Sequence, residues 1–242
     1  MITLTRRGII LSEIAFNKQL RIALDPNILS DDAINVTSHA HTDHTPKKIL
    51  SDTTVCTKTT RSMIEFYKPK HKIKALERYE DDFVKITQKD AGHCLGSRMA
   101  MIKNKESGKK ILYTGDYNTL KKYCGQGQPK RCDELIVEST YGEPKYEFPD
   151  YKNTTKELLD YLKKKKKKRI AIRTYNFGKP QEIAFLLDKN KIEFKLDQKL
   201  KDIHKAIGLD YEYENDDADI LISPKPQESM LNIGCSGWAL SS

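Results

Sequence analysis

Three of the six histidines in this 242-residue chain lie within the segment His39-Ala-His41-Thr-Asp43-His44. The segment follows a β-branched run, and residues two apart in an extended chain project to the same side. His39 and His41 can therefore reach one metal ion together. After the chain turns, Asp43 and His44 can face a second ion. Imidazole and carboxylate ligands without thiolate suit zinc, manganese or iron in an open catalytic site, so we predict a metal centre here rather than a polar loop.

Two later turns carry further ligand types. His93 lies in the glycine-bearing turn Gly92-His-Cys-Leu-Gly96-Ser97, and Asp116 follows the apolar strand Ile111–Thr114. Either turn alone is ordinary in proteins of any function. Their order after the histidine segment is what predicts a metallohydrolase.

These segments must be positioned by a sheet-rich first half. Short runs of β-branched and apolar residues between turn signals predict strands there, with one helix over 59–68. The expected strands cover residues 8–16, 20–26, 33–40, 53–58, 81–87, 99–104, 109–117 and 134–140.

In the second half, strands alternate with helices, and this alternation predicts a parallel α/β layer. The expected helices cover residues 155–168, 180–190 and 200–209, and the expected strands cover 169–177, 192–198, 218–224 and 232–239. The fold class is therefore α/β, with a boundary near residues 145 to 150. The isolated histidines His71 and His204 are interpreted as a surface residue and an ordinary position of an amphipathic helix.

Composition narrows the class of protein. Lysine and arginine number 43 against 34 aspartates and glutamates, a net charge of +9 that favours polyanionic partners. The five cysteines form no C-x-x-C pair, which argues against a disulfide framework or a zinc ribbon. The chain contains no long apolar run and no signal-peptide pattern at its N-terminus, so we expect a cytoplasmic protein without membrane partners.

A further motif, Leu135-Ile-Val-Glu138-Ser-Thr-Tyr141-Gly142, ends a predicted strand on an acidic residue. Together with the histidine segment and the two turns, it resembles the β-CASP nucleases of the metallo-β-lactamase superfamily. The resemblance is to archaeal and bacterial exonuclease-like proteins related to the mRNA 3′-end processing factor, including the DNA-ligase-associated type. The segments at 175–182 and 236–239 are similar to that subgroup.

The resemblance implies a metallo-β-lactamase αββα sandwich over residues 1–145. It also implies a β-CASP-like α/β cap over residues 146–242, C-terminally truncated and ending before the chain returns to the core. The implied function is that of a metal-dependent nucleic-acid phosphodiesterase, in which a bridging hydroxide attacks phosphate. The implied cofactors are two zinc ions, with manganese as the other option.

The resemblance also implies a role for each ligand. The metal-binding set is His39, His41, Asp43, His44, His93 and Asp116. The first two histidines and His93 would hold one ion, Asp43 and His44 the other, and Asp116 would bridge them. Catalytic roles fall to Asp43, Asp116 and Glu138, the last by orienting a ligand histidine. Asp25 is a candidate to hold the histidine loop from beneath.

The chain departs from the β-CASP pattern at its end. β-CASP nucleases carry two further histidines beyond the cap, and neither is visible before Ser242. The sequence is then a fragment of a longer product, a shortened enzyme that uses water or a partner chain instead, or a catalytically impaired paralogue that binds nucleic acid without cutting it. A small-molecule metallohydrolase is a further alternative, although such enzymes usually lack the 135–142 motif and the cap.

Two features of the second half could contact phosphate. Gly178 and Lys179 begin a predicted helix, whose free N–H groups and partial positive charge favour an anion. The run Lys163–Lys168 would add sequence-independent, salt-sensitive contacts, although a solvated charge run is its default interpretation. Single-stranded RNA or DNA is the expected partner. RNA or DNA preference, direction of cleavage and self-association into a homodimer stay open.

Overall fold

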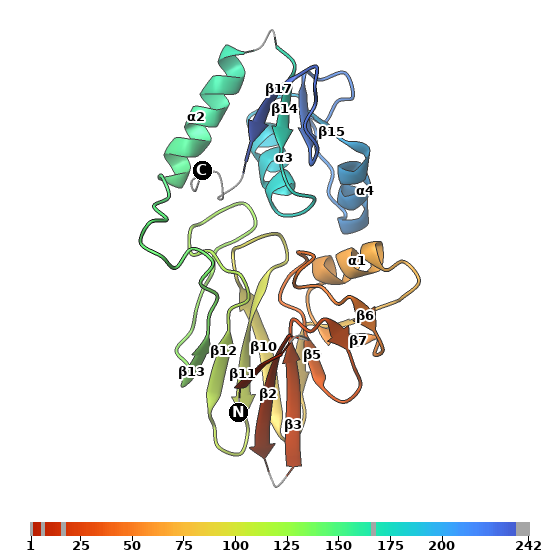
Figure 1. Cartoon of the computed structure of the whole chain (residues 1–242), viewed down its shortest axis with the longest axis vertical. Coiled ribbons are helices and arrows are strands. Elements are labelled where there is room, and N and C mark those ends of the chain that lie inside the picture. The colour runs from red at the N-terminus through yellow and green to blue at the C-terminus, as the bar shows by residue number, and fades with distance from the viewer. Residues whose placement is uncertain (1, 6–7, 16–17, 166–167, 236–242) are drawn as a thin grey trace. The chain divides into compact units, whose positions relative to one another are not determined.

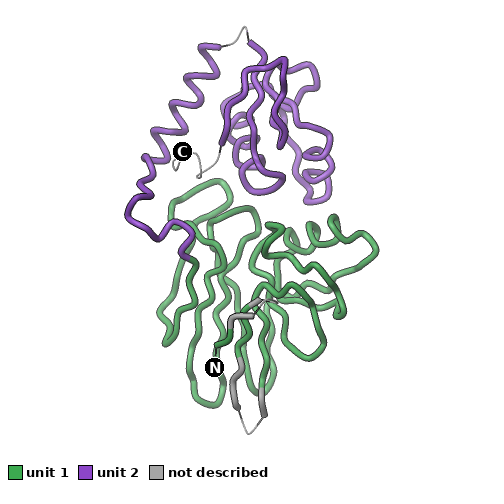
Figure 2. The backbone as a smooth tube through the Cα atoms, in the orientation of Figure 1, with its two compact units in different colours: residues 1–138 green, residues 139–242 purple. Residues whose placement is uncertain are grey.

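The computed structural model describes residues 2–5, 8–15, 18–165 and 168–235. They form two compact units, residues 1–138 and 139–242 (Figure 2). The boundary predicted at 145/146 and the assignment of the two parts as core and cap stay predictions. The segment 236–239 and the lysines at 166–167, both singled out from the sequence, lie outside the described residues.

Unit 1 is built on two sheets, with strand orders β1-β2-β3-β5-β7-β8 and β13-β12-β11-β10-β9 (Figure 1). The first sheet comprises β1 (Ile2–Thr5), β2 (Gly8–Ala15), β3 (Lys18–Leu24), β5 (Ile34–Val36), β7 (Thr53–Val55) and β8 (Lys74–Leu76). The second comprises β9 (Arg78–Glu80), β10 (Val84–Asp90), β11 (Arg98–Asn104), β12 (Lys110–Tyr113) and β13 (Glu134–Ile136). A small sheet pairs β4 (Ile28–Leu29) with β6 (Lys48–Ile49), and α1 spans Lys58–Tyr67.

One buried cluster joins the two sheets. Leu11, Ile22 and Leu24 of the first sheet share it with Ile86 and Ile102 of the second. Alternate side chains of a strand point to opposite faces, so residues that face this core alternate with others along a strand. On β11 and β12 the opposite face is also apolar in part, because Met99 and Leu112 pack in a separate buried cluster. The two sheets therefore pack face to face through their apolar sides.

The direction of the strands decides where the candidate ligands lie. β3, β5 and β7 are parallel, so their carboxyl ends share one edge of the first sheet. In the second sheet β10 and β12 run the same way, because each is antiparallel to β11, and β13 is parallel to β12. The residues that follow these carboxyl ends are Asp25, His39, His93, Asp116 and Glu138.

Unit 2 contains the parallel layer predicted from strand–helix alternation. Its sheet has the order β15-β16-β14-β17, and all of its strand pairs are parallel. The strands are β14 (Ile170–Arg173), β15 (Lys195–Leu196), β16 (Ile220–Ser223) and β17 (Leu231–Gly234), and the helices are α2 (Tyr151–Lys164), α3 (Lys179–Lys189) and α4 (Gln198–Ile207). None of the helices in the described ranges is long and apolar enough to cross a membrane.

Several predicted element boundaries were wrong. The predicted strand 33–40 ends at Val36, and residues 37–40 run on as irregular chain that carries the first histidines. The predicted strand 134–140 ends at Ile136, where pairing with β12 stops. The helix predicted from residue 155 begins at Tyr151, because the Asp150 side chain accepts a hydrogen bond from the Asn153 backbone N–H at 2.9 Å and caps it.

His204 lies on the inner face of α4 and is 2% exposed. The amide nitrogen of Gln181 lies 2.8 Å from its Nε2, and the Gln181 oxygen accepts from the Gly178 backbone N–H at 2.6 Å. The glutamine amide therefore donates to an imidazole nitrogen that carries no proton. Burial lowers the pKa of His204 to about 4.

The buried imidazole predicts a loss of stability in acid. Between about pH 6.5 and pH 4 the unfolded chain binds a proton at His204 that the folded chain excludes, so the free energy of unfolding falls as the pH drops through this window. The difference between a pKa of 6.5 in the unfolded chain and about 4 in the folded chain corresponds to about 3 kcal/mol.

Urea unfolding at pH 7 and pH 4.5 tests this. The free energy of unfolding should fall more steeply between these pH values for the wild type than for His204→Asn. The matched control is His71→Asn at an exposed histidine, which should keep the wild-type slope. Equal slopes for all three proteins would contradict the prediction.

Candidate metal centre

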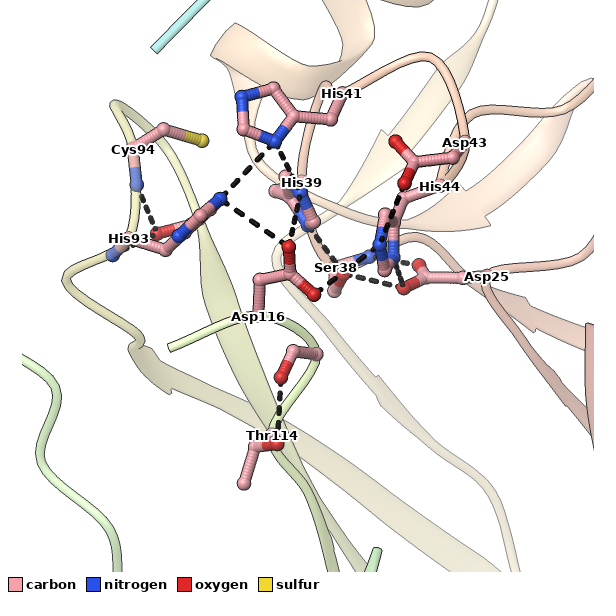
Figure 3. Close-up of polar contacts among 12 residues, drawn as sticks. Asp25, Ser38, His39, His41, Asp43, His44, His93, Cys94, Thr114 and Asp116 are labelled. Carbon is pink, nitrogen blue, oxygen red and sulfur yellow. Dashed lines mark hydrogen bonds and ion pairs between the residues drawn. The ribbon is translucent and has the colours of Figure 1, made fainter. Parts of the chain in front are cut away.

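The chain after β5 and the turn after β10 bring three imidazoles together (Figure 3). His39 Nε2 and His93 Nε2 each lie 3.1 Å from His41 Nδ1. One ligand atom from each ring and one from Asp116 lie within 4.8 Å of one another. Shared protons can stabilise single pairs of ring nitrogens, but a cation stabilises the whole convergent set. The donor set therefore fits a transition-metal ion such as zinc.

Asp116, at the carboxyl end of β12, faces histidines with both of its oxygens. Its Oδ2 lies 3.8 Å from His39 Nε2 and 3.5 Å from His93 Nε2. Its Oδ1 lies 3.3 Å from His44 Nε2. This carboxylate thus stands between His44 Nε2 and the Nε2 atoms of His39 and His93, and its predicted bridging role stays a prediction.

The second group of converging ligand atoms comprises Asp25, His39 and His44. Asp43, expected here from the sequence, has an Oδ2 atom 3.7 Å from His44 Nε2 and a side chain that is 79% exposed. It belongs to neither of the converging groups found among the described residues. Its predicted role as a ligand of the second ion stays a prediction.

Glu138 follows β13 and is half-buried. Its charge acts on Asp116, because it helps to raise the pKa of that carboxyl group. The Nδ1 atoms of two imidazoles contact other residues, Ser38 at His39 and Asp25 at His44. The predicted role of Glu138 in orienting a ligand histidine stays a prediction.

Hydrogen bonds at Nδ1 set the direction of two rings. His39 Nδ1 lies 3.0 Å from Ser38 Oγ, and His44 Nδ1 lies 2.7 Å from Asp25 Oδ2. Donation from Nδ1 leaves Nε2 of the neutral His39 ring unprotonated, and the Nε2 atoms of both rings are directed toward Asp116. Ser38 in turn donates from its hydroxyl to Asp25 Oδ2 at 2.6 Å. The two histidines are therefore oriented through one carboxylate.

Glycines make room for this arrangement. Gly115 has a φ of +52°, and a Cβ atom there would lie 2.6 Å from Ser38 Oγ. The backbone that carries Asp116 can therefore approach the histidine loop only without a side chain. In the other turn Gly92 has a φ of +67°, and the Ser97 hydroxyl accepts from the His93 backbone N–H at 3.1 Å. These turns fix the backbone from which two of the ligands project.

The electrostatics of the site favour a cation. Burial and the neighbouring imidazoles hold the pKa of His39 well below 6.5, so its ring is neutral. Burial alone would lower the pKa of His44, but the hydrogen bond and charge of Asp25, with the charge of Asp116, raise it to about 9. Burial raises the pKa of Asp116 to about 6, against the effect of His44 and reinforced by Glu138. The clustered carboxylates thus stabilise positive charge, and a divalent ion meets the same electrostatic need.

The predicted phosphate contacts belong to unit 2. Gly178 caps α3 with a φ of +89°, and its N–H donates to the Gln181 side chain. Lys179 Nζ lies 2.6 Å from Glu182 Oε2, so a phosphate at this helix end would compete with an internal carboxylate. The predicted role of Gly178 and Lys179 stays a prediction.

Sequence reasoning missed two members of the site, Ser38 and Tyr113. Ser38 precedes the first ligand histidine, and its adjacency was the only signal available. Tyr113 belongs to the apolar strand β12, where a buried tyrosine is an ordinary core residue. Its hydroxyl donates to Asp25 Oδ2 at 2.7 Å, across 88 residues of sequence.

Comparison with known proteins gives relatives for much of the chain, although no protein-family model matches it. A protein of Acidianus ambivalens described as an uncharacterized protein in lig 3′region is 32% identical over 138 residues, which cover 51% of this chain and 86% of that protein. The cleavage and polyadenylation specificity factor subunit 3 of Dictyostelium discoideum is 34% identical over 125 residues, 49% of this chain and 15% of that protein.

An RNase J-like protein of Methanocaldococcus jannaschii is 31% identical over 183 residues, 63% of this chain and 42% of that protein. The matches therefore span less than half of the length of this relative and of the Dictyostelium protein. Among solved structures, a protein of unknown function from Enterococcus faecalis V583 matches 97% of this chain and 75% of its own, with a TM-score of 0.62 and 13% identity. That likeness concerns the fold alone.

Proposed function

The chain belongs to the metallo-β-lactamase superfamily as a relative of its β-CASP nucleases, and we propose that it is a metal-dependent phosphodiesterase that cleaves single-stranded RNA or DNA. One observation carries this proposal. The nitrogens of His39, His41 and His93 converge with the Asp116 carboxylate at the carboxyl ends of strands from both sheets. Such a set suits a catalytic metal ion, and the relatives named for RNA processing suggest the class of substrate.

The finer architecture is part of the proposal. Residues 1–145 would form the αββα sandwich of the superfamily, and residues 146–242 a β-CASP-like cap. The shared core of the two sheets supports the first assignment. The parallel sheet of unit 2, with α3 and α4 in its connections, supports the second.

Each side chain near the site has a proposed task. The three converging imidazoles would hold one zinc or manganese ion, with Asp43 and His44 at a second ion and Asp116 between them. Two ions bound there supply a lowered water pKa and neutralise negative charge on phosphate. The chain itself does the positioning, because Asp25 and Ser38 hold the rings with their Nε2 atoms toward Asp116.

Recognition of the substrate would use charge rather than base identity. The chain has a net charge of +9, and phosphate contacts from basic residues are independent of base sequence. Gly178 and Lys179 are proposed phosphate contacts, in which Lys179 exchanges Glu182 for a phosphate oxygen. Binding should therefore weaken steeply as salt concentration rises.

The test is cleavage of labelled single strands. Protein loaded with zinc or manganese should cut RNA or DNA oligonucleotides, and a chelator should abolish the cleavage. Asp43→Ala should lower the cleavage rate at least about 10-fold, because loss of a residue that only orients a metal ligand already has an effect of this size. Elemental analysis of the purified protein should find a transition metal.

Other results would assign the chain to a different functional class. Equal rates for the wild type and Asp43→Ala would remove the nuclease proposal. Metal and nucleic-acid binding without cleavage would identify an impaired paralogue. Faster hydrolysis of thioesters or lactones than of oligonucleotides would identify a small-molecule metallohydrolase.

A further inference from the structure

Asp25 accepts an unusual number of hydrogen bonds for a residue outside the predicted ligand set. Its Oδ1 accepts from the Ser38 backbone N–H at 2.6 Å. Its Oδ2 accepts from the Ser38 hydroxyl at 2.6 Å, from His44 Nδ1 at 2.7 Å and from the Tyr113 hydroxyl at 2.7 Å (Figure 3 draws the Ser38 and His44 contacts). Asp25 also has a φ of +43°, a conformation that costs free energy outside glycine. These four donors keep the carboxylate in one orientation.

Three of the four donors come from the histidine loop that Asp25 supports. Tyr113 is different, because it projects from β12 of the opposite sheet, whereas Asp25 follows β3. The same strand end carries Asp116, three residues later. Tyr113 thus ties the carboxylate that orients His44 to the strand that presents the proposed bridging ligand.

The chemistry of Tyr113 suits a fixed donor. The residue is 6% exposed, and burial together with the Asp25 charge raises the pKa of its hydroxyl group. The hydroxyl therefore stays protonated and donates to Asp25. The ring packs in the core shared by the two sheets, so the hydroxyl position is set by core packing rather than by the loop.

We propose that Tyr113 is a positioning residue for the second metal position: by holding Asp25 Oδ2 from the opposite sheet, it fixes the direction in which His44 Nε2 points. The inference rests on the proposed metal-dependent function. It predicts a larger effect at the second metal position, because His44 bonds Asp25 directly, whereas His39 is tied to Asp25 only through Ser38. When the Tyr113 hydroxyl is removed, the second position should therefore lose more affinity than the first.

The test compares Tyr113→Phe with the wild type in the full chain. Cobalt(II) titration followed by its visible absorption should show the second equivalent bound about 10-fold more weakly than in the wild type, the size expected for loss of a residue that orients a ligand, and the first equivalent weakened less. Tyr79→Phe is the matched control. That change removes another tyrosine hydroxyl bonded to an aspartate, Asp81 at 3.0 Å, on strand β9 of the same unit. It should leave both equivalents unchanged.

A second readout does not depend on metal or activity. In the metal-free chain, ¹⁵N NMR of the imidazoles should show a shifted His44 Nδ1–H signal in Tyr113→Phe and an unchanged one in Tyr79→Phe. The midpoints of urea unfolding should move by similar amounts in the two variants. A change in second-site affinity that only Tyr113→Phe shows then reflects the orientation of His44 and not a general loss of packing. Unchanged second-site affinity and an unchanged His44 signal would overturn the inference, as would equal weakening of both equivalents. A wild type that binds two ions but cuts no nucleic acid would instead contradict the proposed function and leave the comparison of Tyr113 with Tyr79 decisive.

Discussion

Replacing Asp116 with alanine is expected to lower metal-dependent cleavage by at least about 10³-fold, the largest effect we expect of any single change. Its two oxygens face His44 on one side and the His39–His93 pair on the other. Loss of the Asp116 carboxylate would remove a donor oxygen that both proposed metal positions share. A metal site of this kind supplies several kcal/mol of charge stabilisation in the transition state, and each 1.4 kcal/mol changes the rate about tenfold.

Single-turnover cleavage and metal content measured on the same sample check this prediction. The matched control is Asp217→Ala, which removes the same charge from an exposed position of unit 2. That variant should retain wild-type metal content and rate, so any loss in Asp116→Ala belongs to the site rather than to net charge. Asp116→Ala protein that keeps two tightly bound ions and more than a tenth of the wild-type rate would contradict a bridging role.

The ligands closest in sequence were the easiest to predict. The two-residue spacing of His39 and His41 holds in the structure, where Nε2 of the first lies 3.1 Å from Nδ1 of the second. The prediction assumed extended backbone, but the strand ends at Val36, and the short separation along the chain keeps the two rings close. The position of Asp43 is less simple, because the chain turns after His41 and leaves the Asp43 side chain largely exposed. Local spacing could not fix the direction of a side chain within an irregular turn.

The residues that orient the ligands could not be deduced from spacing. Asp25, Ser38 and Tyr113 are brought together by the pairing of β3 with β5 and by the packing of the second sheet against the first. Each of them is an ordinary residue in its own segment. The α/β class and the parallel sheet of unit 2 were predictable, because they follow from repeated local patterns of apolar residues and helix starts. Contacts between distant strands have no such local pattern.

Replacing Asp25 with alanine is expected to destabilise unit 1 by about 3–5 kcal/mol even without metal, the cost of removing one partner from a buried charged pair. The side chain of Asp25 is 7% exposed, and its loss leaves the Ser38 and Tyr113 donors and the charged His44 ring without their acceptor. Alanine is also poorly suited to the positive φ of +43°, which aspartate and asparagine tolerate better. Asp25→Asn restores that preference but places an amide N–H₂ group among donors, so we expect it to recover only part of the loss.

Urea unfolding in the presence of a chelator measures this cost, because bound metal would add its own stabilisation to the wild type. The informative control is Asp81→Ala. Asp81 also accepts three donors, the Phe83 and Val84 backbone N–H groups and the Tyr79 hydroxyl, but it lies away from the histidines. Both alanine variants should unfold at lower urea, and only Asp25→Ala should also lose metal affinity.

Two outcomes would contradict this prediction. A loss of unfolding free energy below about 1 kcal/mol for Asp25→Ala, within the range of a single ordinary hydrogen bond, would show that the four contacts do not act together. Equal loss of metal affinity in both variants would show that general destabilisation, rather than orientation of His44 and His39, links this carboxylate to the metal centre.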